Sequence, residues 1–554
     1  MDPWLSKSIP RLLDEQAQAL PDQEAFAIDG RRMSYRELAR ESARIARRLM
    51  GTGVGPGSHV AVLMDASAEF VLLHYAVLRT GAIFVPVNFN FKGSELEYAL
   101  RQADCTHLIF GERVAGHDFW ADLEQLTGGF PASAPGVLAA PGFPKLRTIA
   151  CLGRSGRSAP DAFPAVLDYD ALVGGDDPGR AEELAQRQAA IDAGDVSCIL
   201  LTSGSTGFPK LAQVTHRSLV GVAHYYNECL GIEPGARLLG LFTLYHIGGL
   251  GFGVANALSA GACLIASRVF DPGAVLKTIE REQVTVSGFF DTHVTRIMGH
   301  PDFGSTDLSS IRSALFGGTP STYERLHRDW GIPLVSPNFA STETGASIAL
   351  IPRDLSEDAP RRLTNGRPLP GILIRVVDPE TQREAATGES GEIRVKGWSV
   401  CKGYYNQPEQ NAESFDADGY FCTGDIGHFD ADGYLHYTGR YKMMVKTGGE
   451  NVSEIEVENF LAQLVPGLRA VRVVGIPDAL WGEAVTAFVE LEPGIEPLSS
   501  EALRALCKRN VAAYKVPRHV LYLRADEWPV NTSGKVSKPD LRKIAIARLA
   551  APVR

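Results

Sequence analysis

The sequence predicts an α/β fold that ends in a smaller α+β unit. Helical and strand-like segments alternate through the first half of the 554-residue chain, and this order implies parallel strand pairing. After about residue 360 the segments become short and strand-like, with D-G and G-E turn signals between them. From about residue 450 onward, helical and strand-like runs mix, as they do in small α+β units.

The N-terminal half contains several elements that follow one another in regular order. Ser34 and Glu37 have the spacing of a capping box at the start of a helix. We expect a helix over 34–50, a buried strand over 59–64, a helix over 67–81 that ends at Gly81, and a strand over 82–87. Residues 127–165 are rich in Gly, Pro, Ala and Ser, which predicts an irregular surface insertion.

The later segments predict short strands, turns and a final mixed unit. The runs ILIRVVD, GEIRVKG and GYLHYTGR have the composition of strands, and Asp432-Gly433 is a candidate hairpin turn. Nearer the end of the chain, EIEVENFLAQL and EALRALCKRNV are helical, whereas VRVVGI and AVTAFVEL are strand-like. We therefore expect a small sheet with helices packed on it.

Composition excludes several classes of protein. The 55 Lys and Arg residues against 65 Asp and Glu residues give a net charge of −10, which argues against nucleic-acid binding through a global positive field. The eight cysteines are scattered without a C-x-x-C pair, so we expect reduced thiols rather than disulfides or a zinc site. The most apolar run, Phe70 to Leu78, is far shorter than the ~20 residues of a spanning helix. These features predict a soluble, cytoplasmic protein.

One loop has the composition of a phosphate-binding site. It follows the strand-like run CILLT and precedes a helix that Thr215 is expected to cap. Glycines allow backbone N–H groups to point at an anion, hydroxyl groups add donors, and a lysine adds charge. The loop consists of Thr202, Ser203, Gly204, Ser205, Thr206 and Gly207, with Lys210 after it. Its order is not that of a Walker A loop. By composition alone, a Ser/Gly-rich surface turn is an equal alternative.

The residues of this loop and of four later segments resemble, in identity and order, the motifs of one family. TSGSTGFPK, NFASTETG, GEIRVKGWSVCKGYY, the long run from Gly419 to Glu458, and VNTSGKVSK stand in family order over nearly the whole chain. They resemble the motifs of the acyl-adenylate-forming superfamily, which includes acyl-CoA ligases, peptide-synthetase adenylation domains and luciferases. The resemblance implies an N-terminal domain over 1–441, with parallel-rich sheets and a small β-barrel-like part. A small mobile α+β domain would follow over 442–554.

The resemblance also implies a reaction in two halves. A carboxylic acid and ATP give acyl-AMP and pyrophosphate, and the thiol of coenzyme A then displaces AMP. Catalysis would rest on positioning and on charge neutralisation, since two anions meet in the first half. The Thr202–Lys210 loop would hold the β- and γ-phosphates, Glu343 would bind Mg²⁺, and Thr342 would donate to the α-phosphate. A solvated loop acid is the alternative for Glu343.

Further nucleotide contacts are implied by the same motifs. Asp425 would accept hydrogen bonds from the ribose hydroxyls, Arg440 would reach the ribose or the phosphates, and Lys535 would bridge the carboxylate and the α-phosphate. Phe339 would stack on the adenine, where most relatives have Tyr. The remaining residues expected to contact ATP are Gly317, Gly318, Thr319, Asn338, Ala340 and Ser341.

The C-terminal part would carry the hinge and the site for coenzyme A. Lys442 stands at the family's hinge position, where a polar residue accommodates the rotation of the small domain. Met443 follows where the family usually has an acidic residue. Gly448 and Gly449 would line the tunnel for the pantetheine arm. Because the Lys535 motif lies near the end of the chain, we expect no fused carrier domain and free coenzyme A as the acceptor.

The residues around His246 would receive the acid. His246 could orient the carboxylate or gate the thiol, or it could be a packed core histidine. Peptide-synthetase domains carry an acidic residue in this region to hold an α-ammonium group, and its absence disfavours an amino acid. Asp291 could recognise a polar substituent, although capping of the following helix is the favoured interpretation. The expected pocket residues are His246, Ile247, Gly248, Gly249, Phe289, Phe290 and Phe316.

These small and apolar residues predict a roomy apolar pocket for a fatty, aryl, alicyclic or steroid-side-chain acid. Three alternatives to an acid–CoA ligase stay open. They are an acyl-AMP ligase that loads a carrier protein, a luciferase-like oxidase, and a silent nucleotide-binding relative. The expected partners are the small-molecule acid, ATP and coenzyme A, without nucleic acid and without a transmembrane segment. Whether the chain forms a homodimer is also left open.

Overall fold

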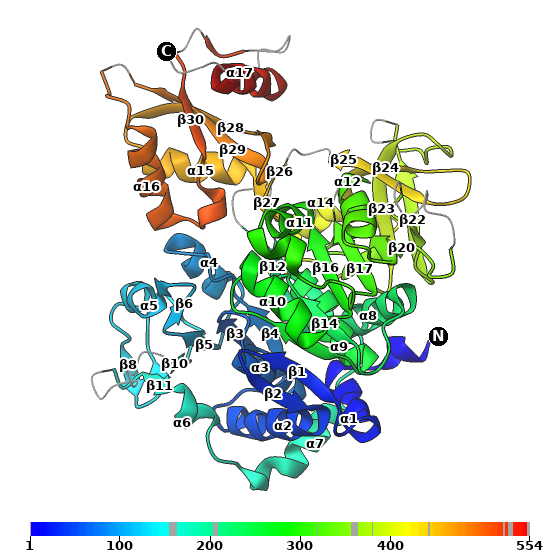
Figure 1. Cartoon of the computed structure of the whole chain (residues 1–554). Coiled ribbons are helices and arrows are strands. Elements are labelled where there is room, and N and C mark those ends of the chain that lie inside the picture. Colours follow the sequence, from blue (N-terminus) through cyan, green and yellow to red (C-terminus); the bar gives the residue numbers. More distant parts are fainter. Residues whose placement is uncertain are drawn as a thin grey trace. The chain divides into compact units, whose positions relative to one another are not determined.

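The computed structural model describes residues 2–153, 163–202, 209–317, 320–355, 364–378, 381–440, 444–492, 494–524, 527–529 and 536–550. The chain forms two compact units. The large unit comprises Met1–Phe89, Ala99–Leu201 and Leu211–Gly439, and the small unit comprises Asn90–Tyr98, Thr202–Lys210 and Arg440–Arg554. Figure 1 shows the elements of both units along the chain. The predicted boundary between residues 441 and 442 stays a prediction.

Two seven-stranded sheets form the framework of the large unit. The first has the strand order β18-β17-β16-β14-β15-β1-β2, and the second has the order β11-β10-β5-β3-β4-β12-β13. The first sheet consists of β1 (Glu24–Ile28), β2 (Arg31–Ser34), β14 (Arg237–Gly240), β15 (Cys263–Ala266), β16 (Val286–Phe290), β17 (Ser313–Gly317) and β18 (Leu334–Pro337). The second consists of β3 (His59–Leu63), β4 (Ile83–Pro86), β5 (His107–Gly111), β10 (Thr148–Leu152), β11 (Val166–Asp168), β12 (Val196–Thr202) and β13 (Lys210–Thr215).

The pairing within these sheets is mostly parallel. In the first sheet only the β1–β2 pair is antiparallel. In the second sheet the strands from β11 through β12 pair in parallel. Parallel strands need crossover segments, which the intervening helices supply. The predicted α/β class is therefore confirmed.

Helices cover the sheets of the large unit and connect their strands (Figure 1). The α-helices are α1 (Ile9–Ala19), α2 (Tyr35–Gly51), α3 (Ala68–Arg79), α4 (Ser94–Gln102), α5 (Phe119–Thr127), α6 (Tyr169–Val173), α7 (Ala181–Ala189), α8 (His216–Leu230), α9 (Asn256–Ala260), α10 (Pro272–Glu282), α11 (Asp291–Met298), α12 (Pro320–Glu324) and α14 (Pro408–Ser414). Short 3₁₀ segments are η1 (Pro3–Ser6), η2 (Pro178–Arg180) and η4 (Pro301–Ser305), and π-helical segments are η3 (Gly248–Ala255) and η5 (Arg325–Asp329).

The large unit has two main hydrophobic cores. One core joins helices α1, α2, α3 and α8 with strands of both seven-stranded sheets, through residues such as Leu73, Phe84 and Leu238. The other core includes Phe289 of β16 and Ile279 of α10. This core therefore lies where α10 packs on the first sheet. Burial of such side chains is the main driving force for folding.

Helix α2 shows why the local sequence folds as predicted. The Ser34 backbone N–H donates to Glu37 Oε2 at 2.9 Å, and the Glu37 N–H donates to Ser34 Oγ at 3.3 Å. This reciprocal capping box satisfies two donors at the start of the helix. Leu38, Ile45 and Leu49 are buried at helical spacing on the inner side. The capping box and the helix are confirmed.

The prediction of an irregular insertion over 127–165 is wrong for one segment. Strand β10 is almost wholly buried and lies between β5 and β11 in the second sheet. Thr148 pairs with His107 of β5, and Ile149 pairs with Val166 of β11. Its five residues lie among Gly, Pro and Ser residues that hide the apolar run. Two short strands, β8 (Ala132–Ala134) and β9 (Val137–Leu138), precede it.

The part of the large unit after β18 is antiparallel. A three-stranded sheet contains β19 (Phe339–Ser341), β20 (Ala346–Leu350) and β21 (Arg367–Pro368). A four-stranded sheet contains β22 (Ile372–Val377), β23 (Gly391–Gly397), β24 (Phe421–Phe429) and β25 (Leu435–Arg440). The Gly433 N–H donates to the Asp430 carbonyl at 3.1 Å, and Gly433 has φ +78°. The predicted turn therefore joins β24 to β25. Strands β6 (Arg113–Val114) and β7 (His117–Asp118) form a separate small hairpin, which comes between β5 and α5 in the chain.

The small unit is a five-stranded sheet with helices on both faces. Its elements are β26 (Met444–Thr447), β27 (Glu450–Ser453), α15 (Glu454–Leu464), β28 (Leu468–Asp478), β29 (Gly482–Leu491), α16 (Ser500–Asn510), η6 (Ala513–Lys515), β30 (His519–Tyr522) and α17 (Lys538–Ala550). One core joins α15 and α16 to the sheet, and another joins α17 to it. The predicted helices and strands of this α+β unit are confirmed.

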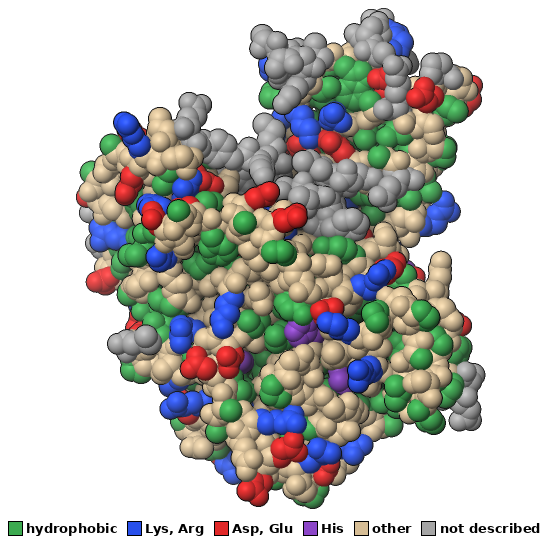
Figure 2. Space-filling view, turned by 180° about the vertical axis from the view of Figure 1, so that it is seen from behind, with side chains coloured by type: hydrophobic (Ala, Val, Ile, Leu, Met, Phe, Trp, Pro, Cys, Tyr) green, Lys and Arg blue, Asp and Glu red, His purple; other side chains and the backbone are tan. Residues whose placement is uncertain are grey.

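Surface charge is mixed in sign. Figure 2 shows Lys and Arg side chains interspersed with Asp and Glu side chains over the visible face. Such a surface does not present the single-sign field of a nucleic-acid binder. Across the part of the chain that the structure describes, no helix is long and apolar enough to cross a membrane.

We expect the buried His74 to make the large unit sensitive to acid. His74 is 1% exposed, and its Nδ1 has no hydrogen-bond partner among the described residues. Burial, with a smaller contribution from His216, lowers the pKa of His74 from 6.5 to about 3. The unfolded chain therefore binds the proton more tightly, and stability is lost as the pH falls from about 6.5 toward about 3.

The His74→Leu variant tests this prediction. The free energy of unfolding of the wild type should fall more steeply between pH 7 and pH 5 than that of the variant. The difference should be on the order of 2 kcal/mol at pH 5, measured by thermal unfolding at each pH. His300→Gln, at a surface position, is the control and should follow the wild type. Equal pH slopes for His74→Leu and the wild type would contradict the assignment.

Candidate active site

Part of the predicted site lies at one edge of the first sheet. Strands β14, β16, β17 and β18 are neighbours in parallel, and the carboxyl ends of parallel strands meet at the same edge of a sheet. In this register Phe290 lies opposite Gly317, and Phe316 lies opposite Pro337. The loop that contains His246 follows β14, and Asn338 follows β18. Segments far apart in the sequence therefore end side by side.

The predicted adenine segment lies directly after β18. The Asn338 N–H donates to the Phe316 carbonyl at 2.8 Å, and the Tyr226 hydroxyl donates to Asn338 Oδ1 at 3.4 Å. Phe339 is 9% exposed, and its ring lies 5.4 Å from the ring of Tyr437 at 36°. Tyr437 was not expected from the sequence. Its only signal there is an aromatic residue in a strand-like run.

A tight turn presents Thr342 and Glu343. The Thr344 N–H donates to Ser341 Oγ at 3.3 Å, and the Gly345 N–H donates to the Thr342 carbonyl at 3.1 Å. Gly345 has φ +71°, and Ala346 has φ +104°, a conformation that a residue with a Cβ rarely adopts. Strained backbone of this kind is concentrated at functional sites.

Glu343 is held from two sides. The Cys401 N–H donates to the Glu343 carbonyl at 2.7 Å, and the Tyr404 hydroxyl donates to Glu343 Oε1 at 2.9 Å. Tyr404 is 3% exposed, and burial raises the pKa of its hydroxyl, which keeps it protonated as a donor. Asn411 accepts from the Tyr404 N–H at 2.6 Å and donates to its carbonyl at 2.8 Å. Tyr404 belongs to the quoted GYY motif, but sequence reasoning gave it no role.

Asp425 and Arg440 lie on neighbouring strands of the four-stranded sheet. Asp425 is 3% exposed on β24, and its N–H donates to Thr423 Oγ1 at 3.0 Å. Arg440 ends β25, the strand that also carries Tyr437. Only the backbone of Arg440 is described. Through its ring contact with Phe339, Tyr437 links the β24–β25 strand pair, which carries Asp425, to the predicted adenine segment.

His246 lies in the loop that follows β14. Its N–H donates to the Thr243 carbonyl at 3.1 Å, and its carbonyl accepts from the Leu250 N–H at 3.0 Å. Its half-buried imidazole lies 4.5 Å from the Tyr245 ring. Ile247 then leads into the π-helical segment η3. π-Helical turns are rare and occur frequently at functional sites.

The glycines after His246 serve close packing. A Cβ at Gly249 would overlap the Thr243 carbonyl oxygen, and a Cβ at Gly248 would lie 3.2 Å from Phe242 Cγ. Neither position opens onto empty space. The inference of a roomy pocket from these glycines is therefore wrong at both positions.

The three phenylalanines expected in the acyl pocket do not line one surface. Neighbouring residues of a strand point to opposite faces of a sheet. Phe289 and Phe316 lie on one face, in the core that contains Trp330, with the Phe289 ring 5.1 Å from the Trp330 ring. Phe290 lies on the other face, with its ring 4.7 Å from that of Phe242. Phe289 and Phe316 are therefore packed core residues, and the assignment of Phe290 to the acyl pocket stays a prediction.

Several predicted site residues lie outside the described residues. These are Ser203, Gly204, Ser205, Thr206, Gly207, Gly318, Thr319, Lys442, Met443 and Lys535, together with the side chain of Asp291. Thr202 ends β12, and Lys210 begins β13. Strand β13 was not expected between the loop and α8. Thr215 accepts from the Ser218 N–H at 3.1 Å, so its predicted role as the cap of α8 is confirmed.

Gly448 and Gly449 form the two-residue turn of the β26–β27 hairpin in the small unit. Thr447 pairs with Glu450 across it, and the two glycines have φ +62° and +84°. Both central residues of such a turn require positive φ, which favours glycine. The Gly448 N–H donates to the Trp481 carbonyl at 2.9 Å, and a Cβ at Gly448 would lie 2.6 Å from the Trp481 ring.

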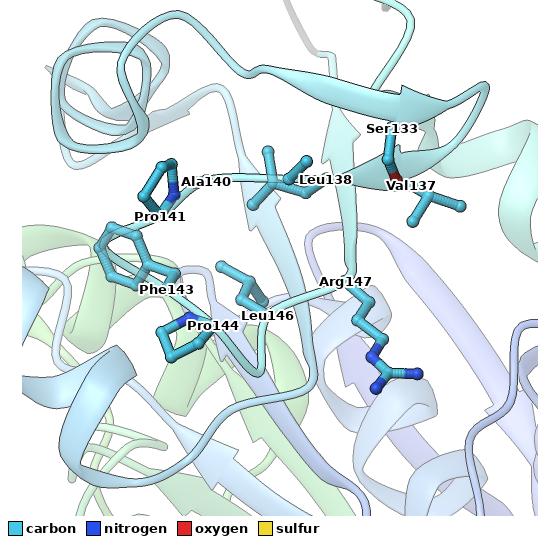
Figure 3. Close-up of a pocket in the computed structure, with 10 residues that line it drawn as sticks. Ser133, Val137, Leu138, Ala140, Pro141, Phe143, Pro144, Leu146 and Arg147 are labelled. Atoms are coloured by element: carbon cyan, nitrogen blue, oxygen red, sulfur yellow. The ribbon is translucent and has the colours of Figure 1, made fainter.

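Two surface hollows are lined by none of the predicted site residues. One, of about 430 Å³, lies in the 133–147 segment and is lined by Leu138, Phe143 and Leu146, with Arg147 at its margin (Figure 3). The other, of about 470 Å³, is lined by residues that include Arg217, Trp398 and Lys402. Neither hollow contributes to the edge at which the candidate site forms.

Comparison with known families agrees with the motifs. The AMP-binding enzyme family matches residues 13–405, and the C-terminal domain of AMP-binding enzymes matches residues 456–535. The chain therefore belongs to the AMP-binding enzyme family, and the resemblance to acyl-adenylate-forming enzymes is confirmed.

Individual relatives extend over nearly the whole chain. A Bacillus subtilis (strain 168) protein, YngI, whose name describes an acyl-CoA synthetase, is 32% identical over 548 residues, or 98% of either chain. A methyl-dioxo-octahydro-indenyl propanoyl:CoA ligase of Rhodococcus jostii (strain RHA1) is 32% identical over 537 residues, or 96% of this chain and 98% of the relative. The solved structure of an o-succinylbenzoate CoA synthetase (MenE) from Bacillus subtilis has a TM-score of 0.77 at 24% identity. It covers 97% of this chain and 98% of its own, and this likeness shows the fold.

We expect Gly345→Ala to destabilise the large unit and to weaken nucleotide binding. A Cβ at this position would overlap the Ser399 carbonyl oxygen and lie 2.8 Å from Ser218 Cβ. The matched control is Gly388→Ala, because Gly388 has φ +85° but nothing lies within 4 Å of its Cβ position. Thermal unfolding and AMP titration should show a larger loss for Gly345→Ala than for the control. Equal losses would mean that positive φ alone, and not the contact with Ser399, explains the glycine.

Proposed function

We propose that the protein is an ATP-dependent acid–CoA ligase. The observation that carries the proposal is the position of Glu343, fixed by Tyr404 within a strained turn beside Thr342. This turn follows Phe339, which contacts Tyr437 on the strand next to that of Asp425. A group for adenine, a group for ribose and a group for phosphate charge thus belong to connected elements of one unit. Membership in the AMP-binding enzyme family supports the same interpretation.

The proposed reaction proceeds in two displacements. In the first, a carboxylate oxygen of the acid attacks the α-phosphorus of ATP, and the bond to pyrophosphate breaks. In the second, the thiolate of coenzyme A attacks the acyl carbon, and the bond to AMP breaks. Thr342 would donate to the α-phosphate, Asp425 would accept from the ribose diol, and Lys535 would neutralise charge where the two anions meet.

A Mg²⁺ ion fits the residues present. Among the described residues, no group of three His, Cys, Asp or Glu side chains could hold a metal ion. Mg²⁺ keeps several waters and takes one or two protein carboxylates together with substrate phosphates. Glu343 offers one half-buried carboxylate whose Oε1 is oriented by Tyr404. When bound, the ion would neutralise charge on the phosphates of ATP.

The small unit would serve the second displacement. We propose Lys442 as the hinge and the Gly448–Gly449 turn as a wall of the path taken by the pantetheine arm. The turn has no side chains, and its backbone is fixed by the hydrogen bond to Trp481. The Trp481 ring occupies the space beside Gly448, so the room for a narrow arm would lie beside the exposed Gly449. The Thr202–Lys210 loop would hold the β- and γ-phosphates during the first displacement.

Release of pyrophosphate that depends on an acid tests the proposed function. Purified protein with ATP and Mg²⁺ should release pyrophosphate with fatty, aryl or alicyclic acids, and added coenzyme A should give acyl-CoA and AMP. Acyl transfer to a carrier protein in place of coenzyme A would contradict the ligase assignment. Absence of pyrophosphate release with every acid would contradict adenylation itself.

Lys535→Ala should separate the two half-reactions. Acid-dependent release of pyrophosphate should fall by about a hundredfold or more, because loss of one charge-stabilising donor has effects of that size. Attack of coenzyme A on supplied acyl-AMP should stay close to the wild-type rate. Lys543→Ala is the control, since Lys543 is exposed on α17 and pairs with Asp540 at 2.8 Å. A parallel loss of both half-reactions would contradict the role given to Lys535.

Tyr404→Phe should weaken the response to Mg²⁺. Without the hydroxyl, Glu343 Oε1 loses its donor, and the loss of such an orienting contact lowers metal affinity roughly tenfold or more. The Mg²⁺ concentration that half-saturates pyrophosphate release should therefore rise. Tyr405→Phe is the matched control, because the neighbouring Tyr405 hydroxyl donates to Asp104 at 3.0 Å instead. An unchanged Mg²⁺ response in Tyr404→Phe would contradict the orienting role given to the Tyr404 hydroxyl.

A further inference from the structure

A cluster of rings lies beside the His246 loop. This ring cluster consists of Phe242, Phe252, Phe290 and His293. The Phe242 ring is central, with centroid distances of 4.7 Å to Phe290, 6.0 Å to Phe252 and 6.1 Å to His293. Phe252 is buried on η3, and Phe290 ends β16. Phe242 lies four residues before His246 and is half-buried.

Two glycines leave the space that the Phe242 ring fills. A Cβ at Gly248 would lie 3.2 Å from Phe242 Cγ, and a Cβ at Gly288 would lie 2.7 Å from Phe242 Cζ. Gly248 belongs to η3 and Gly288 to β16, so the ring lies between these two elements. At Gly317, on the strand next to β16, a Cβ would similarly lie 3.1 Å from Phe290. The rings thus occupy the volume that glycines leave open at this edge of the sheet.

The ring cluster is also uncharged. His293 Nδ1 accepts from the Phe290 N–H at 3.3 Å. Burial, with a smaller contribution from Arg296, lowers the pKa of His293 from 6.5 to about 4, so the imidazole is neutral near pH 7. Its ring also lies 4.8 Å from that of Phe270. A charged group of a substrate would lose its hydration here without gaining a partner of opposite charge in the ring cluster.

We propose that Phe242 determines specificity by limiting how far the apolar tail of an acid extends between η3 and β16. This inference rests on the proposed acid–CoA ligase function. The Phe242 ring fills the gap that joins the His246 loop to the end of β16, and no charged side chain belongs to the ring cluster. The acids accepted should therefore have short or compact apolar tails. Removal of the Phe242 ring should admit longer or wider ones.

Acid-dependent pyrophosphate release tests the proposal with two variants. The kcat/KM values of Phe242→Ala and Phe242→Leu are compared with the wild type over straight-chain acids from butanoate to palmitate and over ring-bearing acids. The ratio of long or wide acids to short acids should rise about tenfold in Phe242→Ala, since a few methylene groups in an apolar pocket have effects of that size. Phe242→Leu should give a smaller shift in the same direction and keeps the proposal testable if the alanine variant unfolds.

Phe289→Leu is the matched control. Phe289 precedes Phe290 in β16 but lies in the core on the opposite face of the sheet. Its replacement should lower stability and total activity without changing the ratio between acids. In a double variant, Gly288→Leu with Phe242→Ala, a side chain re-enters the vacated space. This variant should return the ratio toward the wild-type value.

The outcomes separate the proposal from the function on which it rests. A changed ratio in the Phe242 variants that is reversed in the double variant supports the role of Phe242. Ratios that match the wild type, or that change equally in Phe289→Leu, overturn it. If wild-type protein releases no pyrophosphate with any acid, the proposed function fails instead. Measurement of thermal unfolding for each variant excludes general destabilisation as the cause of a changed ratio.

Discussion

The candidate site depends on the parallel pairing of β14, β16, β17 and β18. Their backbone hydrogen bonds fix which residues end at the common edge, so that Phe290 lies opposite Gly317 and Phe316 opposite Pro337. A slip of one residue would turn each side chain to the other face of the sheet. The His246 loop and the Asn338 segment follow strands of this set and inherit their positions from it. Contacts between distant segments thus originate in main-chain pairing rather than in the site residues themselves.

Close packing of backbone segments against one another then shapes the candidate site at this edge. Gly345 and Gly249 stand where any Cβ would meet a carbonyl oxygen, and Ala346 adopts φ +104°. At Gly345 and Gly249 the backbone of the Glu343 turn and of the His246 loop packs directly against neighbouring backbone. The surrounding hydrogen bonds, such as that from Tyr404 to Glu343, offset the local strain. In the proposed function, a carboxylate that is already oriented needs less rearrangement when it takes up the cation that accompanies a polyphosphate.

Local sequence patterns predicted the helices and their caps, whereas the features that were missed depend on contacts between distant segments. The capping box of Ser34 and the cap at Thr215 need only neighbouring residues, and both were readable from the sequence. Strand β10 was missed because its partners β5 and β11 stabilise a run too short to stand out among glycines and prolines. Phe289 was placed in the pocket because the sequence does not show which face of β16 packs in the core. Tyr404 and Tyr437 contact residues 61 and 98 positions earlier in the chain (404 − 343 and 437 − 339).

The two halves of the site differ in how they can be recognised. The proposed nucleotide half consists of motifs that resemble those of the family, so its candidate residues can be named from the sequence alone. The acid half lies largely outside those motifs, and its glycines gave a false impression of space. The space beside a glycine can be filled by a neighbouring aromatic ring, as it is at Gly248 and Gly288 by Phe242. If the acid binds between η3 and β16 as proposed, its accepted shape depends on how side chains from both elements pack together, which no single residue of the sequence shows.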